Sequence, residues 1–86
     1  MITKEVLVKN ATGLHARPAT LLVKKASSFK SDVSLEFNGK KANVKSLIGV
    51  LSLAVGKDAK VTVIANGDDE AAAADQIAEL IANLAD

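Results

Sequence analysis

The spacing of apolar residues along the chain predicts four β-strands. Residues 31–37 alternate apolar and polar side chains, and the apolar ones are Val33, Leu35 and Phe37. Asn38-Gly39 follows at once and tolerates the positive φ angles of a type I′ turn, which predicts a hairpin whose return strand runs from residue 40 to about 44. The same alternation predicts two further strands, over residues 2–8 and 60–66.

Helical spacing of apolar residues predicts three helices. The first covers residues 16–27, with Pro18 in its first turn, where the missing N–H costs little. Its apolar face consists of Ala19, Leu22, Val23 and Ala26. A short second helix covers residues 47–53, with Ser46 as its N-cap, and a third covers residues 70–84. The apolar face of the third consists of Ala73, Ile77, Leu80, Ile81 and Leu84.

The elements therefore follow the order βαββαβα. The alternation in the second strand indicates a sheet with one buried face and one face in water, and helices must cover the buried face. We predict an α+β fold, an open-faced β-sandwich in which a four-stranded, mainly antiparallel sheet carries three helices on one face.

The length and composition limit what this chain can contain. Its 86 residues predict a single domain, residues 1–86, with no room for separate nucleotide and substrate domains. Hydrophobic residues make up 49%, which suffices for one core. The absence of cysteine excludes disulfides and thiolate chemistry and suits the cytoplasm. We expect no membrane association, because neither a leader pattern nor a membrane-length apolar run occurs.

The net charge of +1 hides an uneven distribution. Residues 1–60 contain all eleven lysines and arginines and four acids, for a net charge of +7, whereas residues 61–86 contain six acids and no base, for −6. A basic surface fits an acidic protein or nucleic acid. Nucleic acid is disfavoured, because Phe29 and Phe37 are the only aromatic residues and offer no stacking platform. The alternative is that the lysines only keep the surface hydrated.

The candidate chemistry centres on the only histidine. Standard hydrolase, nucleotide-binding and metal-binding motifs are missing from the sequence, so neither a cofactor nor a metal is expected. His15 lies just before the first predicted helix, in the string Gly13-Leu14-His15-Ala16-Arg17-Pro18-Ala19. The positive end of the helix would attract a phosphoryl group on the ring. The N–H groups of Ala16 and Arg17 and the Arg17 guanidinium would be its donors. The alternative is that His15 caps the helix and Arg17 is an ordinary surface charge.

A second candidate position is Ser46, which precedes the mostly apolar string Leu47-Ile48-Gly49-Val50-Leu51. So short a helix cannot bury every side, and some of Leu47, Ile48 and Leu51 are expected to face outward as a docking patch. The alternative is that all of them belong to the core and that Ser46 is only a helix cap.

The string around His15, the string that Ser46 opens, the length and the order of elements together resemble the HPr family of the bacterial phosphoenolpyruvate:sugar phosphotransferase system. The resemblance covers the whole chain. It implies that His15 is a phosphoryl carrier that accepts the group on Nδ1 from phosphorylated enzyme I and passes it to the enzyme IIA domains of sugar permeases. Arg17 would stabilise the phosphorylated state.

The resemblance also implies regulation at Ser46. This residue matches the serine that an HPr kinase/phosphorylase phosphorylates in the Gram-positive type, where the phosphoserine form binds a catabolite-control repressor. Partners would cover a reusable surface that is apolar in the middle and basic at the rim. Its expected members are Thr20, Lys24, Leu47, Ile48 and Leu51. We expect a monomer that makes no direct contact with nucleic acid.

The sequence therefore leaves three functions open. The first is a phosphoryl carrier, and the second is a purely regulatory adaptor that uses Ser46 and the apolar patch while His15 is inert. The third is a small nucleic-acid-binding domain. Incubation with phosphoenolpyruvate and enzyme I separates the first two, because only a carrier would gain acid-labile phosphate.

Overall fold

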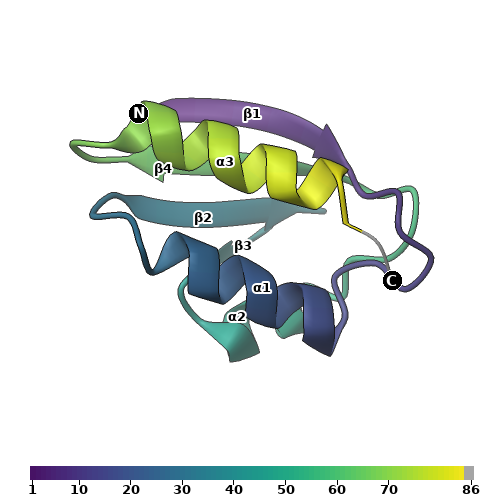
Figure 1. Ribbon diagram of the computed structural model, residues 1–86. Helices are drawn as coiled ribbons and strands as arrows, with labels where there is room; N and C mark the ends of the chain where they lie inside the picture. Colours follow the sequence, from purple (N-terminus) through teal and green to yellow (C-terminus); the bar gives the residue numbers. More distant parts are fainter. Residues whose placement is uncertain (85–86) are drawn as a thin grey trace.

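The computed structural model describes residues 1–84 and has the predicted order of elements (Figure 1). The elements are β1 (Ile2–Leu7), α1 (Ala16–Ala26), β2 (Asp32–Phe37), β3 (Lys40–Asn43), α2 (Leu47–Ser52), β4 (Lys60–Asn66) and α3 (Glu70–Ala82). Six of the seven differ from the predicted bounds by one or two residues at an end, and β4 agrees at both ends. Leu84, predicted to end the third helix, lies beyond α3 but is still half-buried against the core.

The sheet has the strand order β1-β4-β2-β3, and every neighbouring pair is antiparallel. Its register aligns the inward positions, because Val6 pairs with Val61 and Val33 pairs with Ala65. A single-residue shift would turn these side chains toward water. The predicted antiparallel sheet is therefore confirmed, with β1 and β3 as its edges.

The turn between β2 and β3 is built by Asn38 and Gly39. Their φ angles are 57° and 81°, and a type I′ turn needs positive φ at both central residues. The hairpin predicted from the Asn-Gly pair is thus confirmed.

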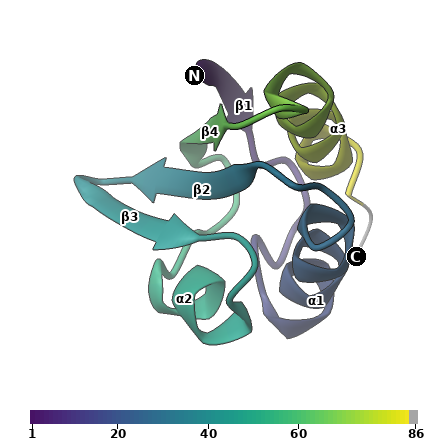
Figure 2. The same cartoon turned by 90° about the vertical axis from the view of Figure 1, so that its left-hand side faces the viewer.

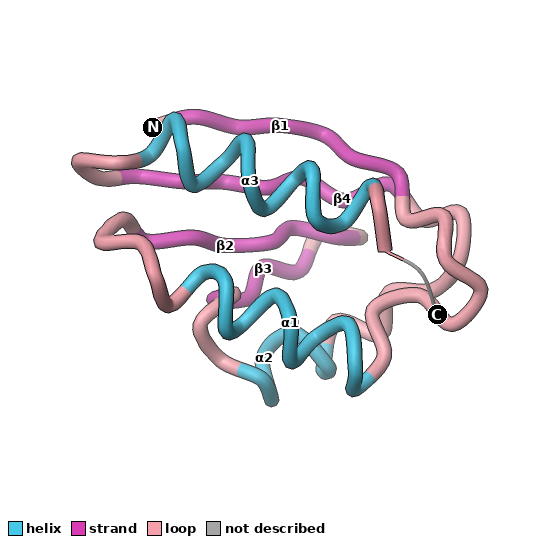
Figure 3. The backbone as a smooth tube through the Cα atoms, in the orientation of Figure 1, coloured by secondary structure: helices cyan, strands magenta, loops and turns pink. Residues whose placement is uncertain are grey.

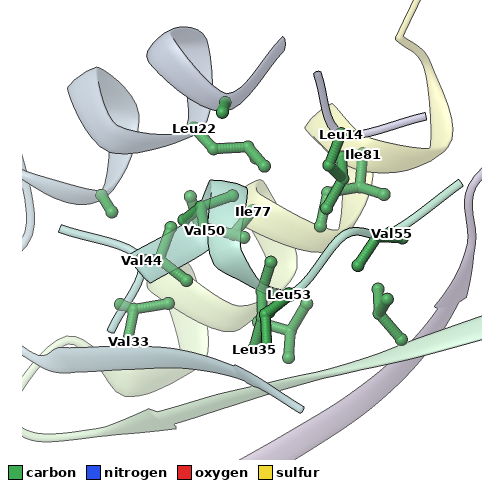
Figure 4. Close-up of a cluster of buried hydrophobic side chains, with 14 of the residues drawn as sticks. Leu14, Leu22, Val33, Leu35, Val44, Val50, Leu53, Val55, Ile77 and Ile81 are labelled. Atoms are coloured by element: carbon green, nitrogen blue, oxygen red, sulfur yellow. The ribbon is translucent and has the colours of Figure 1, made fainter. Parts of the chain in front are cut away.

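The three helices lie on one side of the sheet, as predicted (Figures 1 and 2). The end-on view shows α1 between its two helical neighbours, with α2 beside the β3 edge and α3 over β1 and β4. Helices and sheet together enclose the core. Ten of its side chains are labelled in Figure 4, namely Leu14, Leu22, Val33, Leu35, Val44, Val50, Leu53, Val55, Ile77 and Ile81.

One polar cluster connects loops at the end of the sheet where β2 begins and β4 ends. Asp69, the residue before α3, accepts the backbone N–H groups of Lys30 and Ser31, each at 2.9 Å, and contacts the Ser31 hydroxyl. That hydroxyl in turn accepts the N–H of Asp69 at 3.2 Å. The cluster holds the start of β2 against the start of α3.

The opposite end of the sheet carries two loops that meet, the loop before α1 and the loop between α2 and β4 (Figure 3). The N–H of Leu14 donates to the carbonyl of Val55 at 3.0 Å. This contact places the sole histidine of the chain at that end. Among residues 1–84, no helix has the length and apolar character needed to cross a membrane.

Candidate functional site

The loop that carries His15 is fixed on both sides by buried residues. Leu14 precedes it with 3% of its surface exposed, and Pro18 and Ala19 follow it as buried members of α1. Between them, His15, Ala16 and Arg17 are all exposed. The three residues therefore form a short projection whose backbone is held by its neighbours.

Gly13 allows the loop to approach the segment after α2. Its φ is +66°, and a Cβ built there would lie 2.4 Å from the Val55 carbonyl oxygen and 2.7 Å from the Gly56 Cα. Any other residue would push the two loops apart, because both contacts are with backbone. The Asn10 amide supports the turn by donating from Nδ2 to the Gly13 carbonyl at 2.6 Å.

His15 occupies the N-cap position of α1, with φ of −79° and ψ of −174°. Its carbonyl accepts the N–H of Ala19 at 2.8 Å, but its side chain makes no capping hydrogen bond. The imidazole is therefore not used as a cap, which was the plain alternative. The first N–H groups of a helix have no acceptor inside it, so Ala16 and Arg17 present donors at the N-terminus of α1, next to His15 in the chain.

Arg17 lies in the first turn of α1 and is exposed. Within residues 1–84 its guanidinium makes neither an ion pair nor a hydrogen bond. It is available for an anion at the helix N-terminus, where the helix dipole has the same sign. Thr20, one turn later, is also exposed, and its hydroxyl donates to the Ala16 carbonyl at 2.8 Å.

Ser46 is the N-cap of α2, as predicted, and its Oγ accepts the N–H of Gly49 at 3.1 Å. The side chain is nevertheless exposed. Lys45 beside it is half-buried and donates from Nζ to the Phe29 carbonyl at 3.0 Å, just past the end of α1. The segment before α2 thus contacts the segment after α1. The segment after α2 contacts the segment before α1, through the hydrogen bond from Leu14 to Val55, so the two helices run in opposite directions. Ser46 and His15 therefore lie toward opposite ends of the α1–α2 pair.

The predicted apolar patch on α2 is exposed. The exposed fractions are 39% for Leu47, 81% for Ile48 and 38% for Leu51, whereas Val50 between them is fully buried. The alternative in which all of these side chains belong to the core is wrong. With Thr20 and Lys24 on the neighbouring α1, they form the surface that we call the docking patch.

The sequence analysis missed Leu21, whose exposed fraction is 47%. An apolar residue next to the buried Leu22 is expected to be buried too, so the pattern gave no sign of its exposure. The signal that could have identified it is its spacing of four residues from Arg17, which puts both on one face of α1.

Within residues 1–84 no group of three histidine, cysteine or acidic side chains is arranged to hold a metal ion.

Comparison with known proteins gives consistent results. A family model described as "PTS HPr component phosphorylation site" matches residues 2–83. The chain is similar to the solved structure of HPr-C-His from Thermoanaerobacter tengcongensis, with 44% identity, a TM-score of 0.91, and coverage of 94% of this chain and 91% of that chain. The chain is also similar to the phosphocarrier protein HPr from Bacillus anthracis, with 38% identity, a TM-score of 0.90, and coverage of 93% of this chain and 95% of that chain. It is similar as well to Crh, the Bacillus subtilis catabolite repression HPr, with 46% identity, a TM-score of 0.73, and coverage of 96% of this chain and 99% of that chain.

Proposed function

This chain belongs to the HPr family of phosphotransferase-system phosphocarriers, and we propose that His15 is the residue that carries its phosphoryl group. One observation supports this assignment above the others. The His15 ring is exposed at the N-terminus of α1 and is not used as a cap, while the backbone on either side is held by buried residues.

The proposed transfer is a displacement at phosphorus. The lone pair of an unprotonated His15 nitrogen, Nδ1 in the family, forms a new P–N bond while the P–N bond of the donor's phosphohistidine breaks. The donor's imidazole keeps the electron pair of the broken bond. The phosphoryl oxygens accept the Ala16 and Arg17 N–H groups and the Arg17 guanidinium, which offset their negative charge.

The family implies phosphotransferase-system partners such as enzyme I and enzyme IIA. We propose that each covers the docking patch in turn, because a carrier must offer the same exposed residue to donor and acceptor. Three exposed leucine and isoleucine side chains on α2 supply an apolar centre, and Lys24 supplies charge at the rim. We place this exchange in the cytoplasm, where phosphoenolpyruvate is made.

We propose that the carrier acts as a monomer, since both partners need free access to the His15 end. Solved structures of two similar proteins are described as dimers, an HPr from Thermoanaerobacter tengcongensis and Crh. Analytical ultracentrifugation of this protein in the transfer assay buffer should show one species of about 8.9 kDa.

The carrier role is tested with phosphoenolpyruvate and enzyme I. The parent protein should gain one acid-labile, base-stable phosphate, and His15→Ala should gain none while keeping its circular dichroism spectrum. Arg17→Ala is the matched variant: its transfer should slow about 10- to 100-fold, because a hydrogen bond to a charged group contributes about 1.5–3 kcal/mol. Full phosphorylation of His15→Ala would refute the assignment.

A second function, regulation through Ser46, is favoured by the similarity to Crh, which is described as a catabolite repression HPr. We propose that a kinase of the HPr kinase/phosphorylase type phosphorylates this serine and that a catabolite-control repressor reads the product. Phosphate on Oγ would stay near the Gly49 N–H and the positive end of α2, so the fold should tolerate it. Acceptance of phosphate by His15 in the enzyme I assay would separate this chain from a purely regulatory adaptor.

Ser46→Asp tests the regulatory role. The new carboxylate lies at the edge of the apolar patch and should repel an acidic partner, so phosphorylation of His15 by enzyme I should slow at sub-saturating concentrations. Aspartate remains a good N-cap, and the melting temperature should stay near that of the parent. Ser46→Asn, a neutral cap of similar size, is the control. Equal rates for the two variants would leave Ser46 as a helix cap only.

A further inference from the structure

A groove runs between α1 and α3, on the side of α1 that faces away from α2. One part has a volume of about 440 Å³ and is lined by Lys25, Gln76, Glu79, Leu80 and Asn83. A second part has a volume of about 370 Å³ and is lined by Leu21, Lys24, Lys25, Ser28 and Leu80. The two parts share Lys25 and Leu80 and therefore form one surface, which we call the α1–α3 groove.

The groove has an apolar floor and one basic wall. Leu21 and the half-buried Leu80 supply the floor, and Lys24 and Lys25 supply the wall on α1. Within residues 1–84 neither lysine makes an ion pair or a side-chain hydrogen bond. Their position in the last turn of α1 is favourable for the helix dipole, but it gives no reason for the exposed Leu21 one turn earlier.

The groove is continuous with the His15 end of the molecule. Arg17, Leu21 and Lys24 follow one another along the same face of α1, at spacings of four and three residues. Lys24 belongs both to the docking patch on the α2 side and to the groove on the α3 side. A protein that covers His15 and the crest of α1 therefore reaches both surfaces.

We propose that the α1–α3 groove is a second docking site for an acidic segment of the protein that exchanges the phosphoryl group with His15. A branched apolar side chain of that segment contacts Leu21 and Leu80, and its carboxylates pair with Lys24 and Lys25. The opposite wall, formed by Gln76, Glu79 and Asn83, offers amides to the backbone of the segment and disfavours a strongly negative group on that side. This proposal rests on the carrier role of His15.

The charge is tested by comparing Lys25→Glu with Lys40→Glu. Lys40 is exposed in the β2–β3 hairpin, outside the groove, so both variants change the net charge equally and general attraction cancels. Lys25→Glu should raise KM about fivefold above the control for enzyme I or for enzyme IIA, with kcat within about twofold of the parent. Equal KM values for the two variants with both partners would overturn the proposal.

Proximity is tested by a photo-reactive side chain at Gln76, an exposed residue of α3 outside the docking patch. Irradiation with enzyme I or enzyme IIA should give a covalent adduct, and the same probe at Glu36, on the open face of the sheet, should give none. No adduct at Gln76, or an adduct without the KM difference at Lys25, overturns the groove proposal. A parent protein that gains no phosphate at His15 would instead refute the carrier role.

Discussion

Asp69 belongs to a cluster of hydrogen bonds at the end of the sheet opposite His15. Its carboxylate accepts two backbone N–H groups and contacts the Ser31 hydroxyl. These hydrogen bonds, with the Ser31 side chain first and the Lys30 backbone next, lower the pKa of Asp69 from 3.8 to about 2. The pKa of Glu70 is lowered as well, by the chain's terminal ammonium and the Gly67 N–H.

These pKa values predict how stability depends on pH. The folded-state pKa of Asp69 is below its unfolded value, so its contribution is complete above about pH 4 and disappears as the pH falls through about 2. Urea unfolding at pH 7, 4, 3 and 2 should show this loss. Asp69→Asn should be less stable at pH 7 and should lose less on acidification, whereas Asp68→Asn, next to it and outside the cluster, should follow the parent. A parent-like acid slope for Asp69→Asn would contradict the argument.

Sequence reasoning could propose the candidate site residues but could not predict this cluster. His15, Arg17 and Ser46 each precede or open a helix, and a helix start is visible locally from capping residues and proline. Ser31 and Asp69 are 38 residues apart, and the sequence around each of them does not predict that they are in contact. Long-range polar contacts depend on the packing of whole elements, which periodicity does not specify.

At the scale of elements, the end of α2 conflicts with local preference. Ala54 follows the C-cap Leu53 and has a φ of 55°, while its N–H donates to the Leu51 carbonyl at 3.1 Å. This left-handed conformation is the usual place for glycine, because a Cβ is strained there. The sequence offers no glycine at this point, so the helix end was predicted one residue late, at residue 53. The Asn38-Gly39 turn, in contrast, carries its own signal and was predicted correctly.

Replacing Ala54 with glycine should therefore stabilise the protein. Relief of the left-handed strain outweighs the greater chain entropy of glycine, for a net gain of about 0.5–1 kcal/mol and a rise in Tm of about 3–6 °C. Ala72→Gly, on the exposed face of α3, is the matched control and should destabilise by about 1 kcal/mol. Thermal unfolding measures both. A lower Tm for Ala54→Gly as well as for Ala72→Gly would show that the left-handed conformation of Ala54 does not destabilise the protein.

At the scale of the whole molecule, the structure shows where the uneven charge of the sequence is neutralised and where it is not. The acidic charge of α3 is partly neutralised by residues 1–4, because the Met1 ammonium pairs with Glu70 at 2.8 Å and Lys4 pairs with Asp75. The bases of α1, Arg17, Lys24 and Lys25, have no such partners within residues 1–84. Positive charge is thus left uncompensated along the helix that begins at His15.

This arrangement predicts that salt slows docking. Exposed charges are screened within about 8 Å at physiological ionic strength, so the attraction between α1 and an acidic partner weakens as salt rises. Stopped-flow association with enzyme I should slow about tenfold between 0.05 and 0.5 M NaCl, while dissociation should change little, because salt does not screen apolar contacts. Lys24→Gln should flatten this salt dependence, and Lys60→Gln, at the start of the inner strand β4 and outside α1, should leave it nearly unchanged. An association rate independent of salt would show that the uncompensated charge of α1 does not guide the partner, and the docking patch would then act through its apolar centre alone.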